Sequence, residues 1–176
     1  MKNEPALTFR SSRLAARLAA LEVELLAFIT PYPSDLHGLP HLREVSLLAG
    51  FLADAEGQDV ERVMVAGFLH DCERRDDGVD PRHGERSATK ACLLVPRLFP
   101  HLDAAAIARA IKLHAGGITT QDDPDAVLWD ADRLTLVRLG YRVDPRRLST
   151  SCAKRLVKVG AVDVLREHAA AAVQGV

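Results

Sequence analysis

The sequence has few cysteines, few aromatic residues and no excess of charge of one sign. Its three cysteines, Cys72, Cys92 and Cys152, are odd in number, far apart and without CxxC spacing, which argues against a disulfide framework and against a thiolate zinc site. Basic residues number 23 and acidic residues 24, for a formal net charge of -1. Because no global field would attract nucleic acid or a membrane surface, we expect neither as a partner.

Long apolar runs are also absent. No run approaches the roughly 18 apolar residues of a membrane-spanning helix, and the N-terminal stretch MKNEPALTFR lacks the apolar core of a secretory signal. Extended alternation of β-branched residues is missing, whereas Ala, Leu, Val and Arg are abundant, which favours helix. At 176 residues the chain suits one domain with a sizeable core. The sequence therefore predicts a cytoplasmic, all-α, single-domain protein over residues 1–176.

Apolar spacing and breaker residues predict a bundle of about six to seven helices. Asp59, Asp80 and Asp103 are expected N-caps, and Pro40 and Pro81 are expected in first turns. The expected helices cover about residues 10–29, 40–57, 59–71, 81–96, 103–114, 123–140 and 153–172, the sixth opening at Asp123 and Pro124.

The stretch VMVAGFLHDC, residues 63–72, predicts a buried helix that ends in His70 and Asp71. Carrying a histidine and an aspartate to the end of an apolar helix costs desolvation energy unless something pairs with them, and a divalent cation satisfies both. For an isolated pair, the commoner explanation is a capping histidine with a solvated aspartate. Cys72 is expected to be a small packed residue and not a nucleophile.

Four of the seven histidines fall at the ends of predicted helices. His41 and His83 lie near starts, and His70 and His114 near stops. In an antiparallel bundle the starts of some helices lie beside the stops of their neighbours, so these four could surround one point with Asp71 and a carboxylate from the sixth helix. Imidazole and carboxylate ligands suit Mn, Fe, Co, Ni or Zn, and Mg is a further possibility.

The carboxylate of the sixth helix is ambiguous between Asp130 and Asp132. Two residues on a helix are about 200° apart, so only one of them can face a given metal. The other could orient Arg133 or a ligand histidine.

An ordered set of residues resembles the HD superfamily of metal-dependent phosphohydrolases. The set comprises His41 in HLREV, His70 and Asp71 in FLHDC, and the aspartate of DADRL. It covers about residues 37–140. The family's usual Ala-Asp-Arg-Leu favours Asp132, with Asp130 as the alternative. The resemblance implies a helical bundle of the HD type that holds a divalent metal.

Two further histidines resemble the longer pattern of binuclear HD proteins, namely His83 in DPRHGER and His114 in KLHAGG. That pattern includes cyclic-nucleotide and cyclic-dinucleotide phosphodiesterases, and di-iron oxygenases such as myo-inositol oxygenase. The resemblance therefore implies one ion or two.

Two positions depart from the family pattern. Family members usually have Arg-Val three and four residues after the first histidine, whereas here Arg43 is at two and Val45 at four. The glutamate that helps catalysis in HD nucleotidases lies four residues after the motif histidine, and Arg74 stands there, with Glu73 one residue early. A nucleotidase copied residue for residue is not expected.

The net charge of the site would differ between a centre with one metal ion and a centre with two. One divalent ion with two carboxylates is formally neutral, whereas two ions keep about two positive charges, attract an anion and lower the pKa of bound water to about 7. Asp71 is the natural bridge. Candidate phosphate contacts are Arg74 above all, and also Arg75, Arg82 and Arg86. His37 is either a proton donor or a residue behind a ligand histidine, with a loop-capping role as the alternative.

These features predict a hydrolase that cleaves a small phosphate ester or anhydride, for which a nucleotide is one candidate, with Asp71, Arg74 and His37 as catalytic residues. Two alternatives stay open. The first is a di-iron oxygenase that uses the same six ligands, and the second is a non-catalytic helical module that binds a nucleotide or a partner, which the missing glutamate favours.

Overall fold

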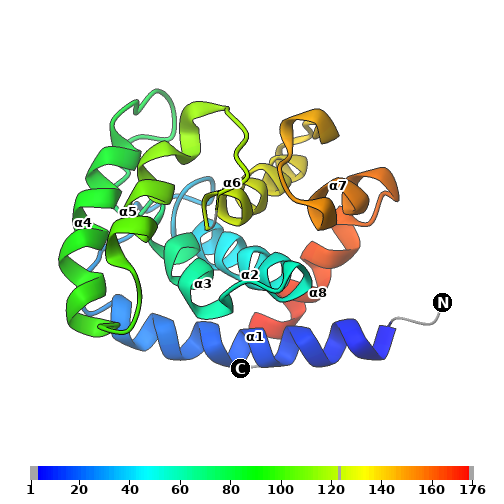
Figure 1. Ribbon diagram of the computed structural model, residues 1–176, viewed down its shortest axis with the longest axis horizontal. Coiled ribbons are helices and arrows are strands. Elements are labelled where there is room, and N and C mark those ends of the chain that lie inside the picture. The colour runs from blue at the N-terminus through cyan, green and yellow to red at the C-terminus, as the bar shows by residue number, and fades with distance from the viewer. Residues whose placement is uncertain (1–3, 123, 175–176) are drawn as a thin grey trace.

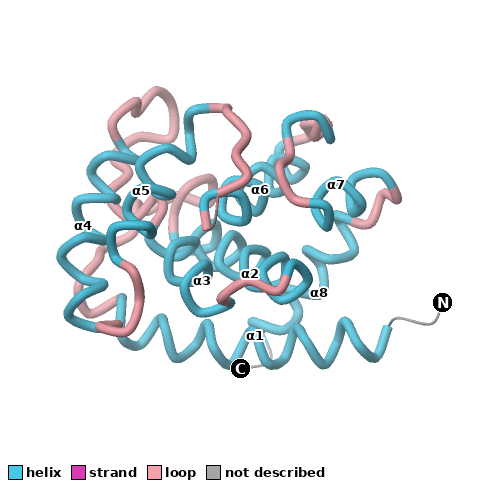
Figure 2. The backbone as a smooth tube through the Cα atoms, viewed as in Figure 1, coloured by secondary structure: helices cyan, strands magenta, loops and turns pink. Residues whose placement is uncertain are grey.

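The structure is a computed structural model that describes residues 4–122 and 124–174, with side chains from 12–122 and 124–171. In this part of the chain helices and loops are the only elements, and no strand is drawn in Figure 2. The prediction of an all-α protein is confirmed. Its eight α-helices are α1 (Glu4–Leu25), α2 (Leu39–Glu56), α3 (Val60–Leu69), α4 (His83–Leu98), α5 (Ala104–Leu113), α6 (Asp125–Leu134), α7 (Ser151–Lys158) and α8 (Val162–Gln174), and three short 3-10 helices are η1 (His114–Gly116), η2 (Thr135–Leu139) and η3 (Pro145–Arg147).

The prediction of six to seven helices was wrong because the last one is divided. Gly160, with φ 67°, takes the left-handed conformation that glycine adopts without strain. It separates α7 from α8 in the middle of the expected helix 153–172. The expected helix 123–140 likewise tightens into η2 after Leu134. Asp123, the expected start of that helix, lies outside the described residues.

Two of the three expected N-caps are confirmed. The Asp59 carboxylate accepts a hydrogen bond from the Arg62 amide at 3.1 Å, and Asp103 caps α5 in the same way. Asp80 does not cap α4, because its carboxylate accepts instead from the Arg75 amide at 3.0 Å and from the Arg86 guanidinium at 2.5 Å. Helix α4 therefore begins at His83, after the turn that contains Pro81.

Helices α2 and α3 occupy the centre of the fold, with α4 and α5 on one side, α6 to α8 on the other and α1 along one edge (Figure 1). A continuous cluster of buried apolar side chains extends from α1 to α8. Trp129 is 1% exposed and donates from its indole N–H to the Ala110 carbonyl at 2.8 Å, which fixes α6 against α5. Among the described helices, none is both long enough and apolar enough to cross a membrane.

Candidate metal centre

The starts of two helices and the ends of three others meet at one point. His41 lies in the first turn of α2, and His83 is the first residue of α4. His70 and Asp71 follow α3 directly, and His114 follows α5. Asp132 lies in the last turn of α6. All are buried except Asp132, whose side chain is 25% exposed. The structure thus brings together the six residues that the sequence analysis proposed as ligands.

One half of the centre consists of His41, His70 and Asp132. The Nε2 atoms of the two histidines are 3.1 Å apart. Asp132 Oδ1 lies 3.4 Å from His41 Nε2 and 3.8 Å from His70 Nε2. These three ligand atoms are close enough to share one ion.

The other half consists of Asp71, His83 and His114. Asp71 Oδ1 lies 3.4 Å from the Nε2 atom of each histidine, and the two Nε2 atoms are 3.1 Å apart. The second oxygen, Asp71 Oδ2, lies 3.9 Å from His70 Nε2. Asp71 therefore faces both halves of the centre, one oxygen to each.

Backbone carbonyls orient three of the four histidines. His70 Nδ1 donates to the Gly67 carbonyl at 2.7 Å, His114 Nδ1 to the Ile111 carbonyl at 2.7 Å, and His83 Nδ1 to the Asp80 carbonyl. A carbonyl oxygen only accepts, so each of these Nδ1 atoms carries a proton. In the neutral ring the Nε2 lone pair then points into the centre, as a metal ligand requires.

The charge states also suit a cation. Burial lowers the pKa of His70 to about 4, which keeps the imidazole neutral at neutral pH. Burial alone would raise the pKa of Asp71, but His70, His114 and His83 outweigh it and hold that pKa well below its ordinary value. The same balance, with His41 as the main opposing group, lowers the pKa of Asp132. Neutral imidazoles and ionised carboxylates are the forms that bind metal.

The surroundings of Asp71 Oδ1 indicate whether a cation would fit the site. This buried oxygen has no hydrogen-bond partner within the part of the chain that the structure describes. Its neighbours are the Nε2 atoms of His83 and His114, so three acceptors converge without a donor. An unsatisfied buried polar atom costs about 1–3 kcal/mol, and a cation would satisfy all three. Although burial opposes it, contact with Asp71 raises the pKa of His114, which again indicates that positive charge is favoured here.

Asp130, the alternative ligand, lies elsewhere. It is fully buried, and its carboxylate accepts from the Ser149 amide at 2.8 Å, the Thr150 amide at 2.7 Å and the Thr150 hydroxyl at 2.8 Å. The structure therefore places Asp132 at the centre and gives Asp130 a role in holding the start of α7.

Of the four proposed phosphate-binding arginines, Arg74 is the one beside the centre. Its Nη1 atom lies 3.4 Å from Asp71 Oδ2, and its side chain is 10% exposed. It also donates to the Asp76 carbonyl at 2.9 Å and to the Gly78 carbonyl at 3.3 Å, which fix its orientation. The other arginines contact different groups: Arg82 pairs with Glu85, Arg86 with Asp80 and the Glu73 carbonyl, and the Arg75 amide donates to Asp80.

His37 lies at the edge of the centre with a partner that the sequence did not reveal. Its ring is edge-on to that of His41, with centroids 5.8 Å apart. Its Nδ1 atom is 3.0 Å from Asp77 Oδ1, which also accepts from the Ser34 hydroxyl at 2.7 Å. Nothing in the polar stretch 73–86 distinguishes Asp77 from the other aspartates there. Cys72 is buried, and burial raises the pKa of its thiol to about 12, as expected of a packed residue.

The arrangement is that of a helical protein in which buried histidines and aspartates could hold a metal ion. The chain belongs to the HD domain family, whose model matches residues 38–137 and so includes all six proposed ligands. A crystal structure described as a predicted HD superfamily hydrolase, from an uncultured Thermotogales bacterium, has a similar fold, with a TM-score of 0.60 and 22% identity over 90% of each chain. No curated protein matches the sequence.

Proposed function

We propose that the protein is a metal-dependent hydrolase of a small phosphate ester or anhydride, for which a nucleotide is one candidate substrate. The observation that carries this proposal is the placement of Asp71, whose Oδ1 atom faces His83 and His114 and whose Oδ2 atom faces His70. A carboxylate shared in this way is typical of two-metal sites in phosphatases and nucleases. Divalent ions there supply Lewis-acid polarisation of a phosphoryl oxygen and a nucleophile from water at neutral pH.

Arg74 is the residue that we expect to bind the phosphate. Its guanidinium lies beside Asp71, and its contacts with two loop carbonyls hold it in position. A guanidinium presents paired N–H donors that match two phosphate oxygens. Substitution of the family glutamate by Arg74 thus exchanges a base for an anion-binding group.

His37 and Asp77 can transfer a proton to the leaving group. Asp77 accepts from His37 Nδ1 and would stabilise the imidazolium, so that the outer ring nitrogen could donate a proton to the leaving oxygen. Hydrogen bonds from Ser34 and His37 hold the pKa of Asp77 below its ordinary value, so it stays ionised. The His37 side chain is 20% exposed and that of Asp132 is 25% exposed, which makes this edge the approach for substrate.

The test is to remove bound metal with a chelator, restore it as Mn2+, and follow hydrolysis of a nitrophenyl phosphodiester and a nitrophenyl phosphomonoester. We expect activity to disappear with the metal and return with it. His114→Ala should abolish both metal retention and turnover, whereas the control His101→Ala, at a side chain that is 60% exposed, should not. Equal turnover in His114→Ala would overturn the assignment.

The same six side chains are also those that the resemblance associates with di-iron oxygenases, so a second candidate function is oxygenase chemistry. Iron in the purified protein with substrate-dependent oxygen consumption would favour it. Phosphate release with Mn2+ or Co2+ would favour the hydrolase. Stoichiometric metal without either activity would favour a non-catalytic module that binds a nucleotide or a partner.

A further inference from the structure

A short loop, residues 34–38, carries His37 to the edge of the metal centre. The Gly38 amide donates to the Ser34 carbonyl at 2.9 Å, and the Leu36 amide donates to the Ser34 hydroxyl at 2.9 Å. A Cβ atom at Gly38 would lie 2.1 Å from the Ser34 carbonyl oxygen, so the turn can close this tightly only with glycine there. The shape of the loop is therefore set within the loop, whereas its place beside the centre needs a contact from elsewhere.

Arg138 supplies that contact. It lies in η2, which follows α6 and the proposed ligand Asp132. Its Nη2 atom donates to the Leu36 carbonyl at 2.5 Å, and its Nη1 atom donates to the Asp35 carbonyl at 3.4 Å. A guanidinium has only donors and a carbonyl oxygen only accepts, so the direction of both hydrogen bonds is fixed. The two carbonyls belong to the residues directly before His37.

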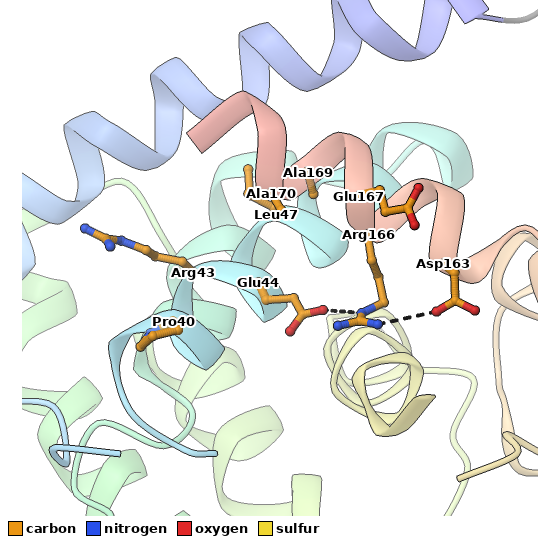
Figure 3. Close-up of a pocket in the computed structure, with 9 residues that line it drawn as sticks. All are labelled: Pro40, Arg43, Glu44, Leu47, Asp163, Arg166, Glu167, Ala169 and Ala170. Carbon is orange, nitrogen blue, oxygen red and sulfur yellow. Dashed lines mark hydrogen bonds and ion pairs between the residues drawn. The ribbon is translucent and has the colours of Figure 1, made fainter. Parts of the chain in front are cut away.

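Acidic neighbours hold the Arg138 guanidinium in turn. Its side chain is 16% exposed, and its Nε atom lies 3.7 Å from Glu44 Oε2 on α2. Glu44 also pairs with Arg166 of α8, which contacts Asp163 at 3.4 Å (Figure 3). A long side chain that is mostly buried and paired has few conformations open to it, so its remaining donors stay directed at the loop.

We propose that Arg138 is a positioning residue for His37. It holds the loop 34–38 against the end of α6, so that the donor ring and the segment that carries Asp132 keep one spacing. This inference rests on the proposed function, in which His37 gives a proton to the leaving group. A proton donor must lie within hydrogen-bond reach of the leaving oxygen, so a loop that shifts loses catalysis even where the fold is kept.

The step that depends on this placement is the departure of the leaving group. As the bond between phosphorus and the leaving oxygen breaks, that oxygen takes a proton from His37. The oxygen of the attacking water replaces it on phosphorus, and the proton that the water gives up restores His37. An acidic leaving group departs without this help, whereas a less acidic one needs it.

The leaving group therefore provides the test. Turnover with Mn2+ is compared for a nitrophenyl phosphodiester and for the corresponding phenyl phosphodiester, whose phenol is less acidic. His37→Ala should lower kcat for the phenyl ester about a hundredfold, and for the nitrophenyl ester by much less. Arg138→Met should show the same selectivity, with a loss of at least about tenfold for the phenyl ester and an unchanged KM, because small displacements of a catalytic group are costly.

A double variant shows whether Arg138 acts through His37. With His37→Ala already present, Arg138→Met should cause no further loss on the phenyl ester, because the group that it positions is gone. Arg142→Met, at an exposed side chain four residues away, controls for the loss of one nearby positive charge and should behave as the wild-type protein on both esters.

Amide hydrogen exchange of the metal-free protein gives a readout that does not depend on activity. Exchange at residues 34–38 should be faster in Arg138→Met, because the Gly38 and Leu36 amides are exposed more often once the loop is released. Exchange in the central helix α3 should not change. Since Arg138 Nη2 also lies 3.2 Å from His41 Nδ1, Mn2+ binding is measured in the same variant and should equal that of the wild-type protein.

Four results would overturn the inference and leave the proposed function intact. They are an equal effect of Arg138→Met on the two esters, additive losses in the double variant, unchanged exchange at residues 34–38, or a loss of Mn2+ from Arg138→Met. A His37→Ala variant without selectivity between the esters would remove the proton donor as well. A wild-type protein that hydrolyses neither ester would overturn the proposed function itself, so these failures are distinguishable.

Discussion

Asp71 and Asp130 are both buried carboxylates, but their surroundings differ completely. Asp130 accepts hydrogen bonds from two backbone amides and a hydroxyl at the start of α7. Asp71 Oδ1 faces the acceptors of His83 and His114 and has no donor among the described residues. A satisfied buried network rigidifies the fold, whereas an unsatisfied one destabilises it. The Asp130 region therefore contributes to stability, and the local cost at Asp71 fits its proposed role in binding metal.

The largest change in activity is expected from a substitution of Asp71, which tests the first half of this comparison. Asp71→Asn removes the charge shared by both halves of the centre, and we expect turnover with Mn2+ to fall at least about a thousandfold, as for loss of a key electrostatic group. The metal-free variant should be no less stable than the wild-type protein, because the new amide N–H can donate to His83 or His114. Denaturant unfolding in the presence of a chelator measures this. A large loss of stability would contradict the functional role.

The reverse result is expected at Asp130. Asp130→Asn places an amide nitrogen against backbone N–H donors and should lower the free energy of unfolding by roughly 3 kcal/mol. Metal content per folded molecule should not change. The matched control is Asp132→Asn, two residues along the same helix, which should lose metal while keeping its metal-free stability. If Asp130→Asn lost metal and Asp132→Asn lost stability, the assignment of these two carboxylates would be reversed.

These two aspartates also illustrate what the sequence could and could not predict. Helical periodicity indicates that Asp130 and Asp132 face different directions, but it does not indicate which of the two faces the metal site. The answer depends on Ser149 and Thr150, which lie 19 and 20 residues after Asp130 in the chain. No local sequence pattern predicts that these residues contact α6.

The four histidines proposed as ligands could be predicted because each lies near the start or the stop of a predicted helix, and capped or proline-led helices have ends that can be recognised. The partner of His37 could not be predicted. Asp77 is one of several aspartates after α3. Its contact with His37 depends on where the loop after α3 lies, which is set by packing between segments far apart in sequence.

A smaller effect on metal binding is expected where α4 crosses α5, and it tests the same comparison. A Cβ atom at Gly84 would lie 3.0 Å from the Lys112 carbonyl oxygen and 3.1 Å from that of Ile111. Gly84→Ala should therefore push the helices apart, separate His83 from His114, and cost about 1–3 kcal/mol of stability. Mn2+ binding should weaken while the Asp130 region is unaffected. Gly116→Ala, where the nearest contact is 4.0 Å away, is the control and should behave as the wild-type protein.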